Sequence, residues 1–187
     1  MDAGLSWEGL RAQLIGQGLK LKFLVGQRFS KFPSNSYAIR KADLANAQMR
    51  DVYTRFFQAM VEGFEFTRAN PRAAAQITYD ARPALAQTLS PQLALDSMVQ
   101  LGSLYGLSHR LGHGWGWHNP ASWRSYLHII YKLGQTKRLL TPAEVLTNQF
   151  VKPANSGANV ALARHKAQAF KLNAQFANTK VPMGEPL

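Results

Sequence analysis

The chain has 187 residues, of which 46% are hydrophobic, and its 22 basic and 10 acidic side chains give a formal net charge of +12. This composition is typical of a folded globular protein and not of a disordered chain. The chain contains no cysteine, which excludes disulfides, thiolate catalysis, Cys-ligated zinc and iron–sulfur clusters. No apolar run reaches the roughly 18 residues that a membrane-spanning helix needs.

The basic excess is spread unevenly along the chain. Residues 1–50 hold 8 basic and 3 acidic side chains, residues 51–118 hold 5 of each, and residues 119–187 hold 9 and 2. A positive field of this size attracts anions of any kind, including nucleic acid and membrane surfaces. Because the basic residues are scattered singly, a solvated basic surface is the simpler interpretation.

The beginning of the chain predicts short elements. Leu10 and Leu14 suggest a short helix, which Gly16 and Gly18 would end. Apolar residues then gather in two short runs, at residues 20–29 and at residues 37–39, which are the strand candidates.

A long amphipathic helix is predicted over residues 46–70. Its apolar side chains recur at steps of three and four, so they form a continuous stripe along one side of the helix. These side chains are Met49, Val52, Tyr53, Phe56, Phe57, Met60, Val61 and Phe64. The helix should end before Pro71, which cannot continue it.

A repeated signal predicts four further helices. Four times, Ser, Thr or Asn is followed directly by Pro and a helical pattern, which suits a capping side chain and a proline in the first turn. The predicted helices cover residues 71–81, 91–105, 120–133 and 142–150. Gly134 is a stop signal for the third, and Thr141 with Glu144 has the spacing of a capping box. Residues 158–177 are predicted to form a basic amphipathic helix.

Residues 106–118 contain too much glycine for regular structure, but they hold an unusual set of side chains. His109 and His113 would share one face of a helix, as zinc ligands do, and His118 follows. The glycines argue against a helix, so loop histidines packed on tryptophans are the favoured interpretation, and no metal site is predicted. Trp115 and Trp117 could stack on a flat ligand, but a plug at one end of a helical core is the favoured interpretation.

Two further groups of residues are weaker candidates for a binding site. Trp7 and Glu8 could stack on a flat ligand and accept its hydrogen bonds, although a buried Trp beside a surface Glu is the simpler interpretation of the pair. The basic side chains of Arg164, His165, Lys166 and Lys171 could touch phosphates or acidic lipid, although a helix packed on the domain with its charges in water is the simpler interpretation. No familiar catalytic or phosphate-binding motif is present in the sequence.

Four segments in order nevertheless resemble a known family. Residues 2–8 (DAGLSWE), 32–39 (FPSNSYAI), 56–75 and 123–150 resemble successive segments of the C-terminal half of a bacterial ABC-importer solute-binding protein. The group is the one that serves nitrate, sulfonates such as taurine, and thiamine precursors. The resemblance covers roughly residues 2–155.

The resemblance implies an α/β fold of the type II periplasmic-binding-protein kind, mostly helical in this chain, with two or three short strands. Residues 1–40 would then form the end of the second lobe and the crossing strand. Residues 41–155 would form the helical part of the first lobe, and residues 156–187 a basic C-terminal helix and tail.

The function that the resemblance implies is capture of a small anionic or heterocyclic nutrient in the periplasm, without catalysis and without a cofactor. Trp7 and Glu8 would lie on the wall of the second lobe, and Asn35 and Tyr37 near the hinge, as ligand-binding residues. ABC permease subunits would be the partners. The first ten residues do not resemble a signal peptide.

The sheet-bearing first lobe of such proteins has no counterpart in this sequence. The chain is therefore expected to be an incomplete fragment, or to pair with a separate N-terminal lobe or with itself, and to expose an apolar patch. No nucleic acid is expected, but a basic helical nucleic-acid-binding module is the rival hypothesis. An enzyme remnant of the thiamine-precursor branch is set aside, because that branch uses a cysteine-rich iron motif.

Overall fold

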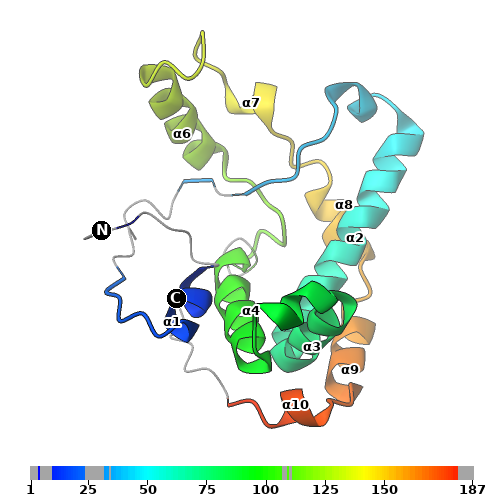
Figure 1. The fold of residues 1–187 in the computed structure, drawn as a ribbon. Helices are drawn as coiled ribbons and strands as arrows, with labels where there is room; N and C mark the ends of the chain where they lie inside the picture. Colours follow the sequence, from blue (N-terminus) through cyan, green and yellow to red (C-terminus); the bar gives the residue numbers. More distant parts are fainter. Residues whose placement is uncertain are drawn as a thin grey trace. The chain divides into compact units, whose positions relative to one another are not determined.

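The computed structural model describes residues 4, 10–23, 32–33, 35–106, 109 and 111–180, and within these ranges every regular element is a helix (Figure 1). The elements are α1 (Arg11–Gly16), η3 (Lys41–Leu44), α2 (Ala47–Ala69), α3 (Pro71–Ala81), η4 (Pro83–Gln87), α4 (Pro91–Tyr105), α6 (Pro120–Lys132), α7 (Pro142–Val145), α8 (Val151–Gly157), α9 (Val160–Ala169) and α10 (Ala174–Ala177).

The chain forms two compact units. The first unit comprises Met1–Lys22, Ala59–Leu107 and Ala158–Leu187, and the second comprises Phe23–Gln58 and Ser108–Gly157. Helix α2 therefore contributes its N-terminal half to the second unit and its C-terminal half to the first. The sequence-based division at residues 40 and 155 rests on the family resemblance and stays a prediction.

The expectation of an α/β fold with short strands is wrong for the described residues, which contain no strand. Residues 35–40 are irregular, and so are residues 20–23; residues 24–31 lie outside the description. A strand needs a neighbour to complete its ladder of hydrogen bonds, and the described residues offer none. Residues 35–40 pack instead through Tyr37, whose ring contacts α2 edge-on.

The helix-start signals of the sequence correspond to real caps. The side chains of Asn70, Ser90 and Asn119 accept hydrogen bonds from first-turn amides of α3, α4 and α6. Asn46, which starts the long helix, accepts one from the Met49 amide at 3.1 Å. The helices predicted over residues 71–81 and 91–105 have those bounds, and Gly134 adopts the positive φ of a helix stop.

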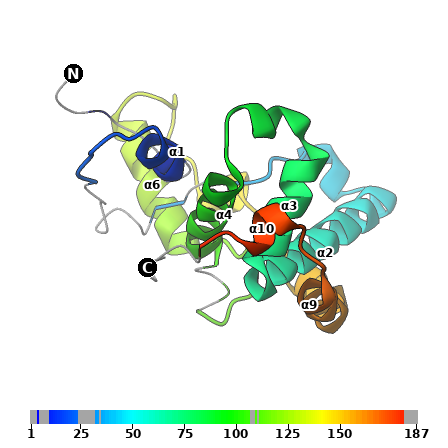
Figure 2. The same cartoon turned by 60° about the horizontal axis from the view of Figure 1, so that its bottom comes forward.

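The core of the first unit lies between α3, α4 and α10 (Figure 2). Its buried members are two alanines, Leu95 and Phe176, and Tyr79 packs edge-on against the Phe176 ring. Helix α1 packs on α4 so closely that a Cβ added at Gly16 would lie 2.5 Å from the methyl carbons of Leu93. Small residues thus allow the helices of this unit to approach each other.

The single helix predicted over residues 158–177 is instead α9 and α10, separated by an extended link. Phe170 leaves the helix with an extended backbone and packs edge-on against Phe66. The Asn173 amide donates to the Gln76 side chain at 3.0 Å, while the Asn173 side chain caps α10. Tertiary contacts therefore override a helical pattern that is continuous in the sequence.

The second unit is organised by aromatic rings. Tyr53 and Phe57 of α2 both contact the ring of Phe150, which is buried, and Phe57 also contacts Tyr37. The helix predicted over residues 142–150 is wrong, because α7 stops at Val145 and α8 begins only at Val151. The intervening residues leave the helix and place the Asn148 side chain against the backbone of residue 118.

Candidate functional site

The predicted ligand-binding residues are not gathered into one described site. Trp7 and Glu8 lie outside the described residues. Asn35 is exposed, and Tyr37 is 58% exposed with its ring resting edge-on against Phe56 and Phe57. Tyr37 therefore packs on α2 while keeping more than half of its surface in water, and its role toward a ligand stays a prediction.

The clearest assembly of chemically distinctive side chains is in the second unit, at residues 109 and 111–119, which we call the histidine–tryptophan loop, together with Trp123 of α6. His113 stacks on Trp117 with ring centroids 3.8 Å apart, and His109 stacks on Trp115 at 4.8 Å. His118 meets Trp123 edge-on. Each of the three histidines of this loop is thus paired with an indole, as the favoured sequence interpretation expected.

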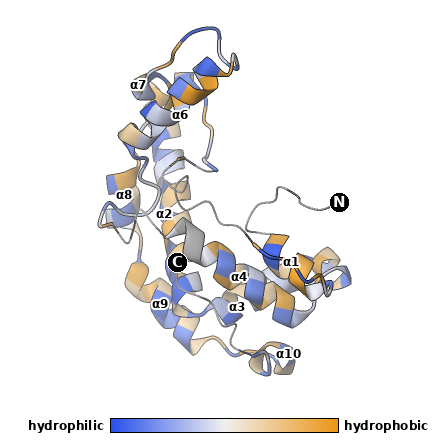
Figure 3. Cartoon of the chain, turned by 90° about the vertical axis from the view of Figure 1, so that its left-hand side faces the viewer, coloured by the Kyte–Doolittle hydropathy of each residue, from blue (hydrophilic) through white to orange (hydrophobic). Residues whose placement is uncertain are grey.

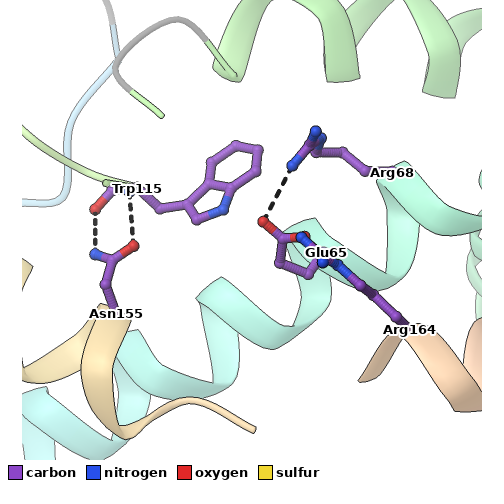
Figure 4. Close-up of polar contacts among 5 residues, drawn as sticks. All are labelled: Glu65, Arg68, Trp115, Asn155 and Arg164. Atoms are coloured by element: carbon purple, nitrogen blue, oxygen red, sulfur yellow. Dashed lines mark hydrogen bonds and ion pairs between the residues drawn. The ribbon is translucent and has the colours of Figure 1, made fainter. Parts of the chain in front are cut away.

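Two asparagine side chains hold the backbone of this loop. The Trp115 amide donates to Asn155 Oδ1 at 2.8 Å, and Asn155 Nδ2 donates back to the Trp115 carbonyl at 3.0 Å (Figure 4). Asn148 makes the same reciprocal pair with His118, at 2.8 Å in both directions. Each side-chain amide therefore replaces the backbone partner that an irregular loop lacks.

Glycines allow the loop backbone to adopt the conformation in which Asn148 and Asn155 can bind it. Gly112, Gly114 and Gly116 all have positive φ, between 79° and 83°. A Cβ at Gly114 would also lie 2.9 Å from Cγ of Asn155, whereas a Cβ at Gly112 or Gly116 would meet nothing within 4 Å. Gly114 is thus required for two reasons, namely its backbone conformation and the close approach of Asn155.

The buried surroundings of His118 favour the neutral form of its ring. Burial lowers its pKa below the ordinary histidine value. Its Nδ1 accepts a hydrogen bond from Trp123 Nε1 at 3.3 Å, so the proton of the neutral ring belongs on Nε2. His118 is therefore an acceptor that orients Trp123. In the described ranges, no three His, Asp or Glu side chains are grouped as metal ligands would be.

The second unit also holds most of the positive charge. Its ranges contain 12 basic and 3 acidic residues, a net +9, which leaves +3 for the first unit. The histidine–tryptophan loop is therefore an anchored aromatic loop within a strongly basic unit. Such a surface can stack on planar groups and attract anions.

A second polar assembly lies in the first unit, around Glu65. This carboxylate is 2% exposed, and it accepts hydrogen bonds from Arg164 and from Arg68 (Figure 4). Its contacts tie α9 to α2. Both arginines have their charge partner within the fold, so the structure assigns Glu65 to holding the unit together.

Sequence reasoning identified the histidines and tryptophans but missed the residues that fix them. Asn148 and Asn155 lie 30 or more residues away from their backbone partners, and an isolated Asn gives no pattern that could reveal this. Comparisons of the chain with protein-family models, with curated proteins and with solved structures gave no match.

Proposed function

We propose that the chain is a solute-binding component of an ABC importer, which holds a small anionic or planar heterocyclic nutrient without transforming it. The observation that supports this most is the anchored stack of His113 on Trp117 within a unit of net charge +9. The order of the four family-like segments in the sequence agrees with it. The α/β fold of that family is not part of the proposal.

The chemistry of the loop suits such a ligand. An indole face held in place by a neighbouring ring offers a stacking surface at little entropic cost, because the loop is already fixed by Asn148 and Asn155. Positive potential around the ring would attract nitrate, a sulfonate or a phosphorylated pyrimidine. Binding without turnover needs only these two features.

An exposed apolar patch in the second unit supports the proposal that the chain binds a partner polypeptide. Val52 and Phe56 are one helical turn apart on α2, both are at least 40% exposed, and Tyr37 extends the patch. A separate polypeptide that brings its own apolar face could cover this patch. The same patch could otherwise promote self-association of the chain.

Titration of the chain with taurine, nitrate and a thiamine-precursor pyrimidine tests the proposal, with tryptophan fluorescence and calorimetry as readouts. One of these ligands should bind, and Trp117→Ala should weaken that binding by at least tenfold. Tyr131→Ala removes an exposed aromatic from α6 and is the matched control. The proposal fails if none of the three ligands binds, or if a ligand binds and is converted.

A second candidate function is nucleic-acid binding by the basic second unit, favoured by the same +9 charge. Single strands would stack bases on Trp117 while Lys and Arg contact phosphates. Such binding would weaken steeply as salt increases, with a slope set by the number of phosphates contacted. Salt-insensitive binding of a small ligand, with no binding of oligonucleotides, would favour the importer proposal.

A further inference from the structure

The apolar side of helix α6 is wider than the part of it that is buried against the rest of the chain. Leu127 points inward and is 3% exposed, and Ile130 is half-buried. On the neighbouring side, Tyr126, Ile129 and Leu133 are 36%, 40% and 67% exposed. At 100° per residue these three positions lie within about 60° of the helix circumference, so they form one continuous strip.

Basic side chains border this strip. Lys132 is exposed on α6 about 60° from Ile129 around the helix, and Lys137 is exposed just beyond the helix. Between Asp96 and Glu185 the only acidic residue in the sequence is Glu144, and this carboxylate pairs with Arg138 at 2.7 Å. The hydropathy colours of Figure 3 show that hydrophobic and hydrophilic residues alternate closely along α6. The surface is therefore apolar and cationic at once.

We propose that this face of α6 docks on an anionic lipid surface. Ile129 and Leu133 would enter the boundary between headgroups and acyl chains, while Lys132 and Lys137 would contact the headgroup phosphates. Tyr126 lies on the same strip and suits the headgroup level, where tyrosine is enriched. In the described ranges no helix is long and apolar enough to cross a bilayer, so α6 would lie in the plane of the interface.

An anionic membrane would contact both the apolar strip and the neighbouring lysines. A second copy of the chain or a nucleic acid would be compatible with only one of these two features. A second copy of the chain would bring the same cations against Lys132 and Lys137, and like charges repel. Nucleic acid would pair with those cations but leave Ile129 and Leu133 in water. The α6 strip meets Trp123 through Tyr126, but Ile129, Leu133, Lys132 and Lys137 take no part in the proposed ligand site, so this proposal goes beyond the proposed function and does not depend on it.

Vesicle flotation tests the proposal, using phosphatidylcholine alone or mixed with phosphatidylglycerol. The chain should float with the anionic vesicles and only weakly with phosphatidylcholine. Ile129→Ser combined with Leu133→Ser should reduce the affinity at least about tenfold, because two aliphatic side chains no longer gain from leaving water. Lys132→Gln and Lys137→Gln should each reduce it roughly fivefold.

Helix α9 supplies matched controls, because Leu162 is 45% exposed and Lys166 is exposed there. Leu162→Ser and Lys166→Gln make the same chemical changes away from α6 and should leave vesicle binding unchanged. Circular dichroism should show all variants folded, since every altered side chain is exposed.

Three outcomes would overturn the proposal. The first is absence of flotation with phosphatidylglycerol vesicles. The second is equal loss of binding in the α6 and α9 variants, which would indicate general charge attraction. The third is a concentration-dependent dimer that Ile129→Ser with Leu133→Ser abolishes, because the face would then bind a second copy. Ligand titration of the same variants separates this result from the proposed function, since the α6 changes leave Trp117 intact.

Discussion

Arg164 donates two hydrogen bonds to a single carboxylate oxygen of Glu65, from Nε at 2.9 Å and from Nη2 at 2.6 Å. The other carboxylate oxygen accepts from Arg68 at 3.2 Å. Glu65 is almost fully buried, whereas both arginines keep about half of their surface in water. The pair links α2 to α9 across 99 residues of sequence through charge-assisted hydrogen bonds.

We predict that Arg164→Ala destabilises the first unit by about 2 kcal/mol, because it removes a charge partner and two hydrogen bonds from a buried carboxylate. Because Arg164 is half-exposed, the expected loss of unfolding free energy is at the lower end of what is typical when a buried ion pair is broken. Arg55→Ala is the control, because its ion pair with Asp51 is exposed on both sides and should contribute at most about 0.5 kcal/mol. Urea unfolding followed by circular dichroism measures both. Equal effects of the two substitutions would contradict the prediction.

The anchoring of the histidine–tryptophan loop gives a second prediction. Asn155→Asp keeps the shape of the side chain and can still accept from the Trp115 amide, but it can no longer donate to the Trp115 carbonyl. The loop should open more often, and exchange of the Trp115 amide hydrogen should accelerate at least about tenfold. Hydrogen exchange read by NMR measures this rate. Unchanged exchange would mean that Asn155 does not hold the loop.

A pair of glycine substitutions separates backbone strain from crowding. Gly112→Ala and Gly114→Ala both place an alanine at positive φ, which costs about 1 kcal/mol in each case. Only Gly114→Ala also pushes a methyl group against Asn155. We predict that Gly114→Ala destabilises the second unit by about 1 kcal/mol or more beyond Gly112→Ala. Thermal unfolding of both variants measures the difference, and equal destabilisation would show that Asn155 simply moves aside.

Local signals in the sequence predicted the helices well where a cap defines their start. Asn70 and Ser90, each followed by proline, fixed the beginnings of α3 and α4, because the capping bond and the proline act within one turn. The break between α9 and α10 could not be predicted this way. It depends on Phe170 packing against Phe66, a contact across about a hundred residues.

The candidate site was predictable in its chemistry but not in its geometry. The alternation of glycine with Trp115 and Trp117 indicated an irregular aromatic loop, and the structure has one. The prediction of short strands was wrong for a related reason, because it too was made from composition without knowledge of tertiary contacts. Residues 37–39 have the composition of a strand, but a strand forms only with a partner, and composition alone cannot show whether one is present.

The pH dependence of Glu144 gives the last prediction. The hydrogen bond from Arg138, followed by those from the Thr141 amide and hydroxyl, lowers the pKa of Glu144 from 4.5 to about 2. Because the folded pKa lies below the unfolded one, the stabilisation by this carboxylate is complete above pH 4.5 and is lost as the pH falls toward 2.

Arg138→Gln should therefore raise the pKa of Glu144 toward 4.5, because the largest cause of the shift is removed. Lys137→Gln removes a neighbouring exposed cation and should leave that pKa close to its original value. NMR titration of the Glu144 carboxyl carbon measures the pKa in all three proteins. A wild-type pKa near 4.5 would show that the Arg138 and Thr141 contacts do not persist in solution. An equal rise in both variants would show that general positive charge, and not the hydrogen bond from Arg138, sets the value.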